Sequence, residues 1–210
     1  RRDRRLANWA QAAGVALKET PQNGVVRRLE DRDGWSKVWE SRMSQPITLP
    51  ARNIGGPMLS DGDVQIPSAE SLGLIRTDRV SQLQGGESDG LRILESFAMG
   101  RGSRYHREMS SPNTAFDSCS RLSPYLTWGC LSMRTAVQRI RAAAGDTLPK
   151  IAARAFISRC HWHCHFMQKL ESEPAIEFHA FNRACETLRD NGNDPARLEA
   201  WQQGRTGYPF

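Results

Sequence analysis

Apolar residues recur every three or four positions along much of this chain, which is the spacing of amphipathic α-helices. The pattern is clearest after residue 83, where glycine and proline separate one apolar run from the next. It predicts a mostly helical fold, with Leu198 and Trp201 turned inward on the last helix. The predicted helices cover residues 87–99, 124–127, 132–144, 148–170 and 196–203.

The first 45 residues mix helix and strand patterns. Residues 1–13 predict a helix that ends at Gly14, and Val15–Leu17 predicts a short buried strand. Pro21–Gly24 predicts a turn, and residues 35–43 predict a second helix. The two tryptophans of that helix are predicted core residues rather than a cofactor platform, because helical spacing explains them. This order of elements is typical of the last third of an α/β domain.

Proline and glycine interrupt every candidate element over residues 46–82. A connection of that length is unusual inside one compact domain. The sequence therefore predicts a linker at residues 46–82, between residues 1–45 and a helical domain at residues 83–210.

Composition is that of a protein with a packed core: 39% of the 210 residues are hydrophobic and 25% are charged. No apolar run approaches the length that spans a bilayer, and no secretory signal is present. The five cysteines are odd in number and mostly lie in helical patterns, which favours reduced thiols and a cytoplasmic protein. The first residue is not Met and the first segment already has a helical pattern, so we interpret the chain as a piece of a longer protein.

The formal net charge is +6. A positive charge of this size permits contact with a phosphate backbone, but it also fits a solvated basic surface.

Residues Ser118–Gly129 (S-C-S-R-L-S-P-Y-L-T-W-G) place four small polar side chains before an apolar run. One interpretation is an ordinary helix start, with Ser123 as the N-cap and Pro124 at the first helical position. The other is an anion cradle, because hydroxyls and free N–H groups at a helix start attract negative charge. The local pattern leaves both open.

Residues Cys160–His165 (C-H-W-H-C-H) form the densest cluster of metal-ligand types. The i, i+4 pairs 160/164 and 161/165 each share a helix face, but the two faces differ by about 100°. No second Cys/His pair is present to complete a four-ligand site. We therefore favour a pocket-lining helix with no resident metal.

Phe156, Arg159 and His163 fall on one predicted helix face, with Trp162 at its border. Two rings, a guanidinium and an imidazole suit a flat aromatic ligand near phosphates. A helix–helix contact explains the same residues equally well.

Three segments together resemble a known family. Cys119–Leu126 resembles the element T-S-x-L-S-P-Y-L, and Trp201–Pro209 resembles W-x-x-G-x-T-G-Y-P. The helix around Phe156–Phe166 lies between them, Gly85–Glu87 resembles the entry into a helical domain, and Pro21–Trp39 resembles the end of an antenna domain. The family with these elements in this order is that of the photolyase/cryptochrome flavoproteins.

The resemblance implies a fold in three parts. These are the C-terminal piece of an α/β Rossmann-like antenna domain (1–45), an interdomain linker (46–82), and the first half of an all-helical FAD-binding domain (83–210). It also implies FAD as the cofactor, together with an antenna chromophore of unknown identity.

The resemblance also implies site residues. The hydroxyls and N–H groups of Ser120, Leu122 and Ser123 would cradle the pyrophosphate, and Arg159 and Trp162 would meet a DNA lesion or an equivalent ligand. The full set of implied cofactor contacts is Tyr105, Cys119, Ser120, Arg121, Leu122, Ser123, Phe156, Arg159 and His163.

Four residues depart from the family pattern. Cys119 replaces a Thr and removes one hydroxyl, and His163 replaces an Arg beside the flavin. Arg159 replaces the Glu that binds the dimer in repairing members, so an acceptor becomes a donor. Asn191 replaces a distal electron-relay Trp.

The implied function is a blue-light-driven DNA photolyase, a carbon–carbon lyase (deoxyribodipyrimidine photo-lyase) that splits pyrimidine dimers by photoinduced electron transfer. The positive charge favours repair. Arg159 favours the alternative, a cryptochrome-type blue-light receptor without repair. A third hypothesis is a zinc-bearing helical nucleic-acid binder. We expect damaged DNA as the partner, a monomer, and no membrane contact.

Overall fold

The structure is a computed structural model, and it describes residues 2–20, 24–49, 67–68, 70–74, 84–188, 192 and 194–208. Helices dominate these residues, as predicted. Extended pairing within them is limited to one bridge, between Ala144 and Leu148.

The helices follow the predicted order closely. A long helix, α8, follows a set of shorter ones, and three single turns of 3-10 helix join neighbours. The α-helices are α1 (Arg2–Ala12), α2 (Trp35–Ser44), α3 (Glu87–Ala98), α4 (Tyr105–Glu108), α5 (Ala115–Ser118), α6 (Ser123–Thr127), α7 (Met133–Ala143), α8 (Lys150–Ser172) and α9 (Pro195–Gln202). The 3-10 turns are η1 (Arg101–Arg104), η2 (Pro174–Glu177) and η3 (Arg183–Cys185).

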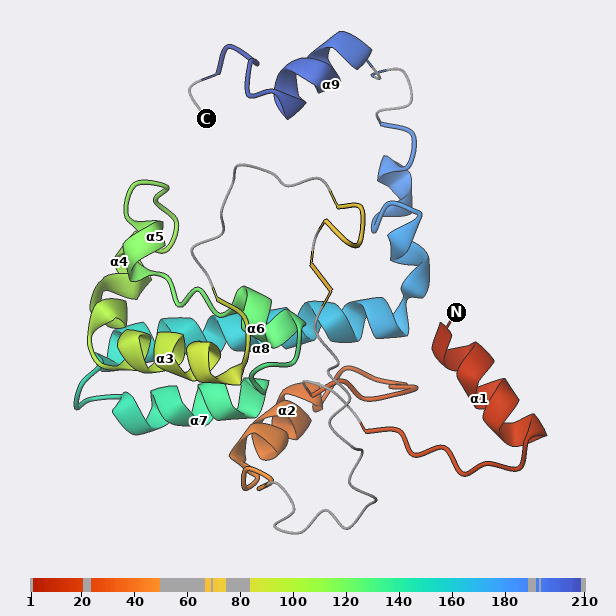
Figure 1. Ribbon diagram of the computed structural model, residues 1–210, viewed down its shortest axis with the longest axis horizontal. Helices are drawn as coiled ribbons and strands as arrows, with labels where there is room; N and C mark the ends of the chain where they lie inside the picture. The colour runs from red at the N-terminus through yellow and green to blue at the C-terminus, as the bar shows by residue number, and fades with distance from the viewer. Residues whose placement is uncertain are drawn as a thin grey trace.

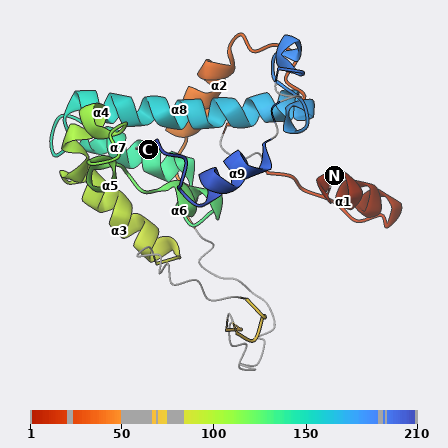
Figure 2. The same ribbon diagram turned by 90° about the horizontal axis from the view of Figure 1, so that it is seen from above.

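The central element is α8, against which α4 and α7 pack, while α3 packs on α7 (Figure 1). Seen from above, α8 runs along one side of this helical body (Figure 2). Its buried side combines small residues with one aromatic ring, and small side chains let neighbouring helices approach closely. The buried residues of this helix are Ala152, Ala153, Phe156, Cys160, Cys164, Gln168 and Lys169.

The helix α2 is held by α7 through its C-terminal carbonyl groups, which have no partner inside the helix. The Arg134 Nε donates to the carbonyl of Arg42 at 2.9 Å, and the Gln138 Nε2 donates to that of Met43 at 2.8 Å. Its tryptophans, Trp35 and Trp39, are 4% and 2% exposed. The prediction that they are core residues is confirmed.

The predicted strand at Val15–Leu17 is wrong. These residues form no regular element, the Val15 N–H donates to the Ala10 carbonyl of α1 at 2.9 Å, and Val15 and Leu17 are each half exposed. A strand needs a neighbouring strand to satisfy its backbone, and the described residues supply none.

A side-chain amide takes the place of a strand partner at Val26. The Val26 N–H donates to Gln168 Oε1 at 2.7 Å, and Gln168 Nε2 donates back to the Val26 carbonyl at 3.1 Å. Gln168 is 2% exposed, so this pair ties the segment before α2 firmly to α8.

The last helix, α9, forms where predicted, and its side chains correct one expectation. Leu198 and Trp201 are 55% and 70% exposed, so they do not point inward. Figure 1 shows α1 and α9 lying apart from the helical body, and Figure 2 shows α1 apart from it as well. An amphipathic pattern shows which face can be buried, whereas burial itself needs a partner surface.

The helix boundaries from residue 84 onward confirm the sequence prediction, and Ser132 caps α7 by accepting from the Thr135 N–H at 3.0 Å. Residues 2–20 and 24–49 form two helices and no strand, so they show no α/β layer. Most of the predicted linker lies outside the described residues. No helix of the described chain is long and apolar enough to cross a bilayer.

The α2–α8 contact contains a histidine that favours its neutral form. The ring of His161 lies edge-on to Trp35 and Trp39, with centroids 4.9 and 5.0 Å away, and its Nε2 lies 3.0 Å from Ser36 Oγ. Burial, and secondarily the charge of His165, lowers the pKa of His161 below its ordinary 6.5, although Glu40 opposes this.

We predict that the free energy of unfolding falls as the pH drops below about 6.5. The unfolded chain then binds a proton that folded His161 resists, so stability falls in that window. Replacing His161 by Gln removes part of this pH dependence, as measured by urea unfolding at pH 7.5 and 5.5.

His163→Gln is the comparison variant: burial also lowers the pKa of His163, so its loss too removes part of the pH dependence. Tryptophan fluorescence from α2 distinguishes the His161 variant from the His163 variant, since the aromatic contacts of Trp35 and Trp39 are with His161 and His165. An unchanged fluorescence-detected pH dependence in His161→Gln contradicts the prediction.

Candidate functional site

The predicted cradle residues lie between two short helices. Residues 117–123, here called the amide segment, leave α5 at Ser118 and enter α6 at Ser123. Tyr105, at the start of α4, lies near enough to Cys119 and to Arg159 for both to affect its ionisation. The structure thus brings Tyr105, the amide segment and part of α8 to one region.

The amide segment has unpaired backbone donors. The N–H groups of Ser120, Arg121, Leu122 and Ser123 make no hydrogen bond with any residue that the structure describes. Leu122 precedes α6 and no side chain caps the helix, so the prediction that Ser123 acts as an N-cap is wrong. Four consecutive free donors are the arrangement that an anion can fill.

The carbonyl side of the same segment is bonded to one guanidinium. Arg101 Nη1 donates to the carbonyls of Asp117 (3.4 Å) and Cys119, and Nη2 donates to that of Ser120 at 3.2 Å. The segment therefore has one side occupied by Arg101 and one side open.

Arg121 adds positive charge at the segment. Its φ is 58°, a left-handed backbone conformation that costs free energy for a residue with a Cβ. Its guanidinium lies 5.0 Å from the ring of Phe116, and its buried Nε has no hydrogen-bond partner within the described structure. A buried donor without a partner is costly unless something else accepts from it.

The four polar side chains of the Ser118–Ser123 stretch divide into two groups. The hydroxyls of Ser120 and Ser123 make no hydrogen bond with any described residue. Ser118 is 5% exposed and donates to Glu108, and the Cys119 thiol lies 3.8 Å from the Met109 carbonyl. Only Ser120 and Ser123 are thus free to bind a ligand through their side chains.

Tyr105 and Phe156 meet in the core. Their ring centroids are 6.2 Å apart, and both rings contact Phe97 at 5.4 and 5.2 Å. Burial raises the pKa of Tyr105 to about 12, so its hydroxyl stays a donor. That hydroxyl has no partner within the described residues, whereas Phe156 is 3% exposed and acts here as a core residue.

The close approach of Phe97 depends on a glycine. A Cβ at Gly102 would lie 2.6 Å from the Phe97 ring, so no larger residue fits without moving it. Gly102 thereby keeps η1 against α3 and sets the place of Arg101 and Tyr105 beside it.

The polar residues of the predicted α8 face are open to solvent. Arg159 and His163 are exposed, and Trp162 is 51% exposed beside Phe166, with ring centroids 5.6 Å apart. Arg159 has no ion-pair partner among the described residues. The face is thus split: Phe156 points into the core, and the other three line an aromatic and basic surface.

The Cys/His cluster does not converge on one point. Cys160 and Cys164 are buried in the core, where burial raises the pKa of both thiols, to about 12 for Cys160. His161 and His165 face the ring of Trp35 instead. No group of three or more potential metal ligands occurs in the described part of the chain.

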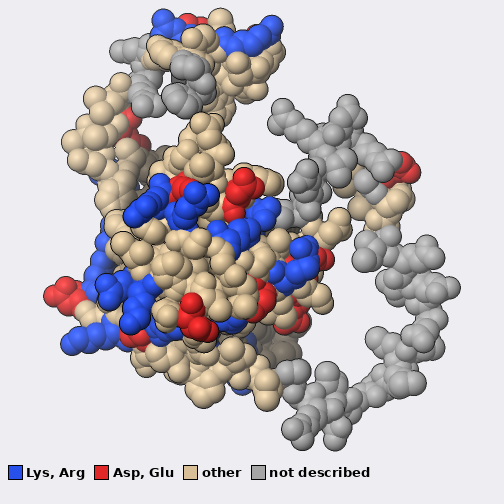
Figure 3. Space-filling model, turned by 90° about the vertical axis from the view of Figure 1, so that its left-hand side faces the viewer, with Lys and Arg blue, Asp and Glu red and all other residues tan. Residues whose placement is uncertain are grey.

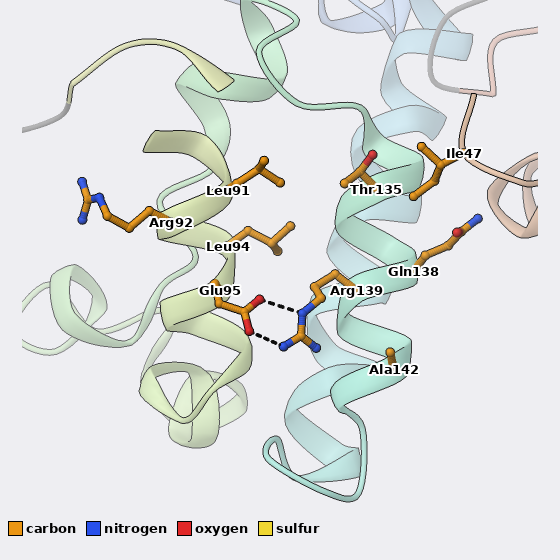
Figure 4. A pocket seen from close by; sticks show the side chains of 9 residues that line it. All are labelled: Ile47, Leu91, Arg92, Leu94, Glu95, Thr135, Gln138, Arg139 and Ala142. Atoms are coloured by element: carbon orange, nitrogen blue, oxygen red, sulfur yellow. Dashed lines mark hydrogen bonds and ion pairs between the residues drawn. The ribbon is translucent and has the colours of Figure 1, made fainter. Parts of the chain in front are cut away.

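A hollow lies elsewhere, between α3 and α7 (Figure 4). Apolar side chains such as Leu91 and Leu94 line it, and an ion pair joins Glu95 to the Nε of Arg139 at 2.7 Å. None of the predicted site residues lines this hollow.

Positive charge is spread over the helical body. Lys and Arg form several separate patches on the face shown in Figure 3, with Asp and Glu between them. Of the implied contacts, Arg121 and Arg159 supply the cationic groups near the amide segment and Tyr105.

Arg101 is the residue that the sequence reasoning missed. Its acceptors in the amide segment lie 16 to 19 residues further along the chain, beyond the reach of helical spacing. The sequence contains one signal for the role of Arg101. It lies between Gly100 and Gly102, where a turn brings a long cationic side chain inward.

The free amides, the two free hydroxyls and the unpaired Arg121 Nε fit a group with phosphate oxygens, as in FAD. Residues 156–210 match the family description "FAD binding domain of DNA photolyase". This match includes α8 from Phe156 onward and the Trp201 element.

Curated relatives match a larger part of the chain. A deoxyribodipyrimidine photo-lyase of Halobacterium salinarum is 29% identical over 183 residues, 84% of this chain and 37% of the relative. A (6-4)DNA photolyase of Arabidopsis thaliana is 27% identical over 177 residues, 80% of this chain and 30% of the relative. Cryptochrome-1 of Mus musculus is 27% identical over 184 residues, 79% of this chain and 30% of the relative.

The chain therefore spans about a third of the length of these relatives. The similarity extends to photolyases and to cryptochromes alike. Together with the helical fold, the matched FAD-binding segment and these relatives support a fragment of the photolyase/cryptochrome family, with FAD as its cofactor.

Proposed function

We propose that the amide segment binds the pyrophosphate of FAD in a photolyase-type protein that repairs pyrimidine dimers in DNA. The observation that carries this proposal is the row of four unpaired N–H groups at residues 120–123, opposite the carbonyls held by Arg101. Donors fixed in place before a ligand arrives bind an anion at lower entropic cost.

The residues of this chain have distinct parts in holding the cofactor. Ser120 and Ser123 would add hydroxyl donors to the backbone N–H groups, and protonated Tyr105 would add a third. Arg121 would supply charge through its unpaired Nε. Cys119 would contribute no donor, because its thiol faces Met109 and its N–H donates to the Ala115 carbonyl.

Bound FAD in its reduced form supplies, on excitation by blue light, the electron that splits a pyrimidine dimer. The chain supplies the surface that would present the lesion. Trp162 offers an exposed ring on which a flipped base can stack, and Arg159 offers donors to its carbonyls or to a nearby phosphate.

The further assignments belong to the same proposal. Residues 1–45 would be the end of an antenna domain carrying an unidentified chromophore, residues 46–82 the linker, and residues 83–210 the first half of the helical domain. Damaged DNA would be the partner of a cytoplasmic monomer.

A blue-light receptor without repair activity is the second candidate. Arg159 is the observation that favours it, because a guanidinium cannot accept the hydrogen bonds that a carboxylate takes from a dimer. The similarity of the chain to photolyases and to cryptochromes is compatible with either function.

We predict that Ser120→Ala combined with Ser123→Ala weakens FAD binding by about 1–3 kcal/mol, since two hydrogen bonds to a charged phosphate are lost. Flavin content and FAD affinity of the purified full-length protein measure this. Thr127→Ala, at the other end of α6, is the matched control and keeps its flavin. Equal flavin content in the double variant would falsify the cradle.

We predict loss of pyrimidine dimers when the full-length protein, with reduced flavin, is illuminated with blue light in the presence of a dimer-containing oligonucleotide. Dark incubation and an undamaged strand are the controls. Tight flavin binding without any dimer loss contradicts the repair function and favours the receptor.

We predict that Arg159→Glu changes affinity for DNA more than it changes flavin content, because Arg159 is exposed on α8. Binding to dimer-containing and intact duplexes at several salt concentrations measures this, since loss of one phosphate contact lowers the salt dependence. Arg154→Glu, also exposed on α8, controls for the change in net charge. A larger effect on flavin than on DNA would show that Arg159 faces the cofactor.

A further inference from the structure

We propose that Arg101 is the positioning residue of the phosphate site: it holds the carbonyl side of the amide segment so that the N–H side stays open to an anion. The inference rests on the proposed binding of the FAD pyrophosphate at this segment. Arg101 is absent from the contacts that the family resemblance implies.

Every N–H donor of the Arg101 guanidinium has an acceptor in the fold. Nη1 donates to the carbonyls of Asp117 and Cys119, and Nη2 donates to those of Ser120 and of Ile93 on α3. Nε donates to Ser96 Oγ at 2.9 Å. A guanidinium has five such hydrogens, so none remains for a ligand. Arg101 therefore positions the site without touching what binds there.

Peptide geometry links these bonds to the open N–H groups. The carbonyl of Cys119 and the N–H of Ser120 belong to one peptide unit, and in a trans peptide they point in opposite directions. The carbonyl of Ser120 and the N–H of Arg121 are related in the same way. When Arg101 holds both carbonyls, both N–H groups face away from it, where they are unpaired.

The charges around Arg101 favour an anion on that open side. None of its five hydrogen bonds goes to a carboxylate, and the cation also lies 5.6 Å from the centre of the Phe97 ring. Burial lowers the pKa of Arg101, and the nearby charge of Arg121 lowers it further, while the charge of Asp117 raises it. A bound phosphate would relieve the repulsion between the two guanidiniums.

Lysine cannot replace Arg101 in this arrangement. Its ammonium is a single point with three donors, so it cannot reach carbonyls on α3 and on two peptides of the amide segment together. Arg101→Lys thus keeps the charge and removes the positioning, and Arg101→Gln removes both. Arg139→Gln is the matched control, because Arg139 pairs with Glu95 away from the amide segment.

The test compares two flavins on full-length protein from which the cofactor has been removed. Riboflavin has the flavin ring without any phosphate, so the ratio of its dissociation constant to that of FAD reports recognition of the rest of FAD, including its pyrophosphate. Quenching of flavin fluorescence measures both constants. We expect this ratio to fall about tenfold in Arg101→Gln and less in Arg101→Lys, with no change in Arg139→Gln.

A ratio that stays at the wild-type value in Arg101→Lys overturns the inference, because the charge alone then suffices, and so does an equal weakening of FAD and riboflavin. Circular dichroism checks the fold, and if Arg101→Gln fails to fold, Arg101→Lys decides. A wild-type protein that binds FAD no better than riboflavin contradicts the proposed phosphate site itself. The failure of the inference and the failure of the proposed function therefore give different results.

Discussion

Burial of one side of α8 is the constraint on which the rest of the structure depends. Its alanines and cysteines leave room for neighbouring helices to approach, and each large side chain buried there stabilises the fold by about 1.5–3 kcal/mol. Phe156 extends this contact to Phe97 and Tyr105, which places α4 and the turn before it. The exposed side of the same helix remains available to a ligand.

In the amide segment, backbone carbonyl groups and backbone N–H groups face different sides of a short loop. Backbone carbonyls and N–H groups occur in equal number, so an irregular loop attracts anions only if its carbonyls are directed elsewhere. Here a cation takes the carbonyls, and its position depends on Gly102, which lets η1 approach the Phe97 ring. Packing in the core and ligand chemistry at the surface are therefore coupled through one side chain.

Helical spacing was sufficient to predict most of the helices and the core role of Trp35 and Trp39. It failed where a partner surface decides the outcome. Val15–Leu17 has the composition of a strand but no strand beside it, while Val26 finds its backbone partner in the side chain of Gln168, 142 residues away. Trp201 lies on a helix that forms where predicted and is still 70% exposed.

By itself the sequence indicated the family, the order of the helices and the serines proposed to meet a phosphate, because these depend on local spacing and on short motifs. The tertiary structure decided which of those residues are free to act. It turned Ser118 and the Cys119 thiol toward other parts of the fold, placed Phe156 in the core and left Ser120 and Ser123 open. It also brought Arg101 beneath the amide segment, since contacts between residues distant along the chain arise only from packing.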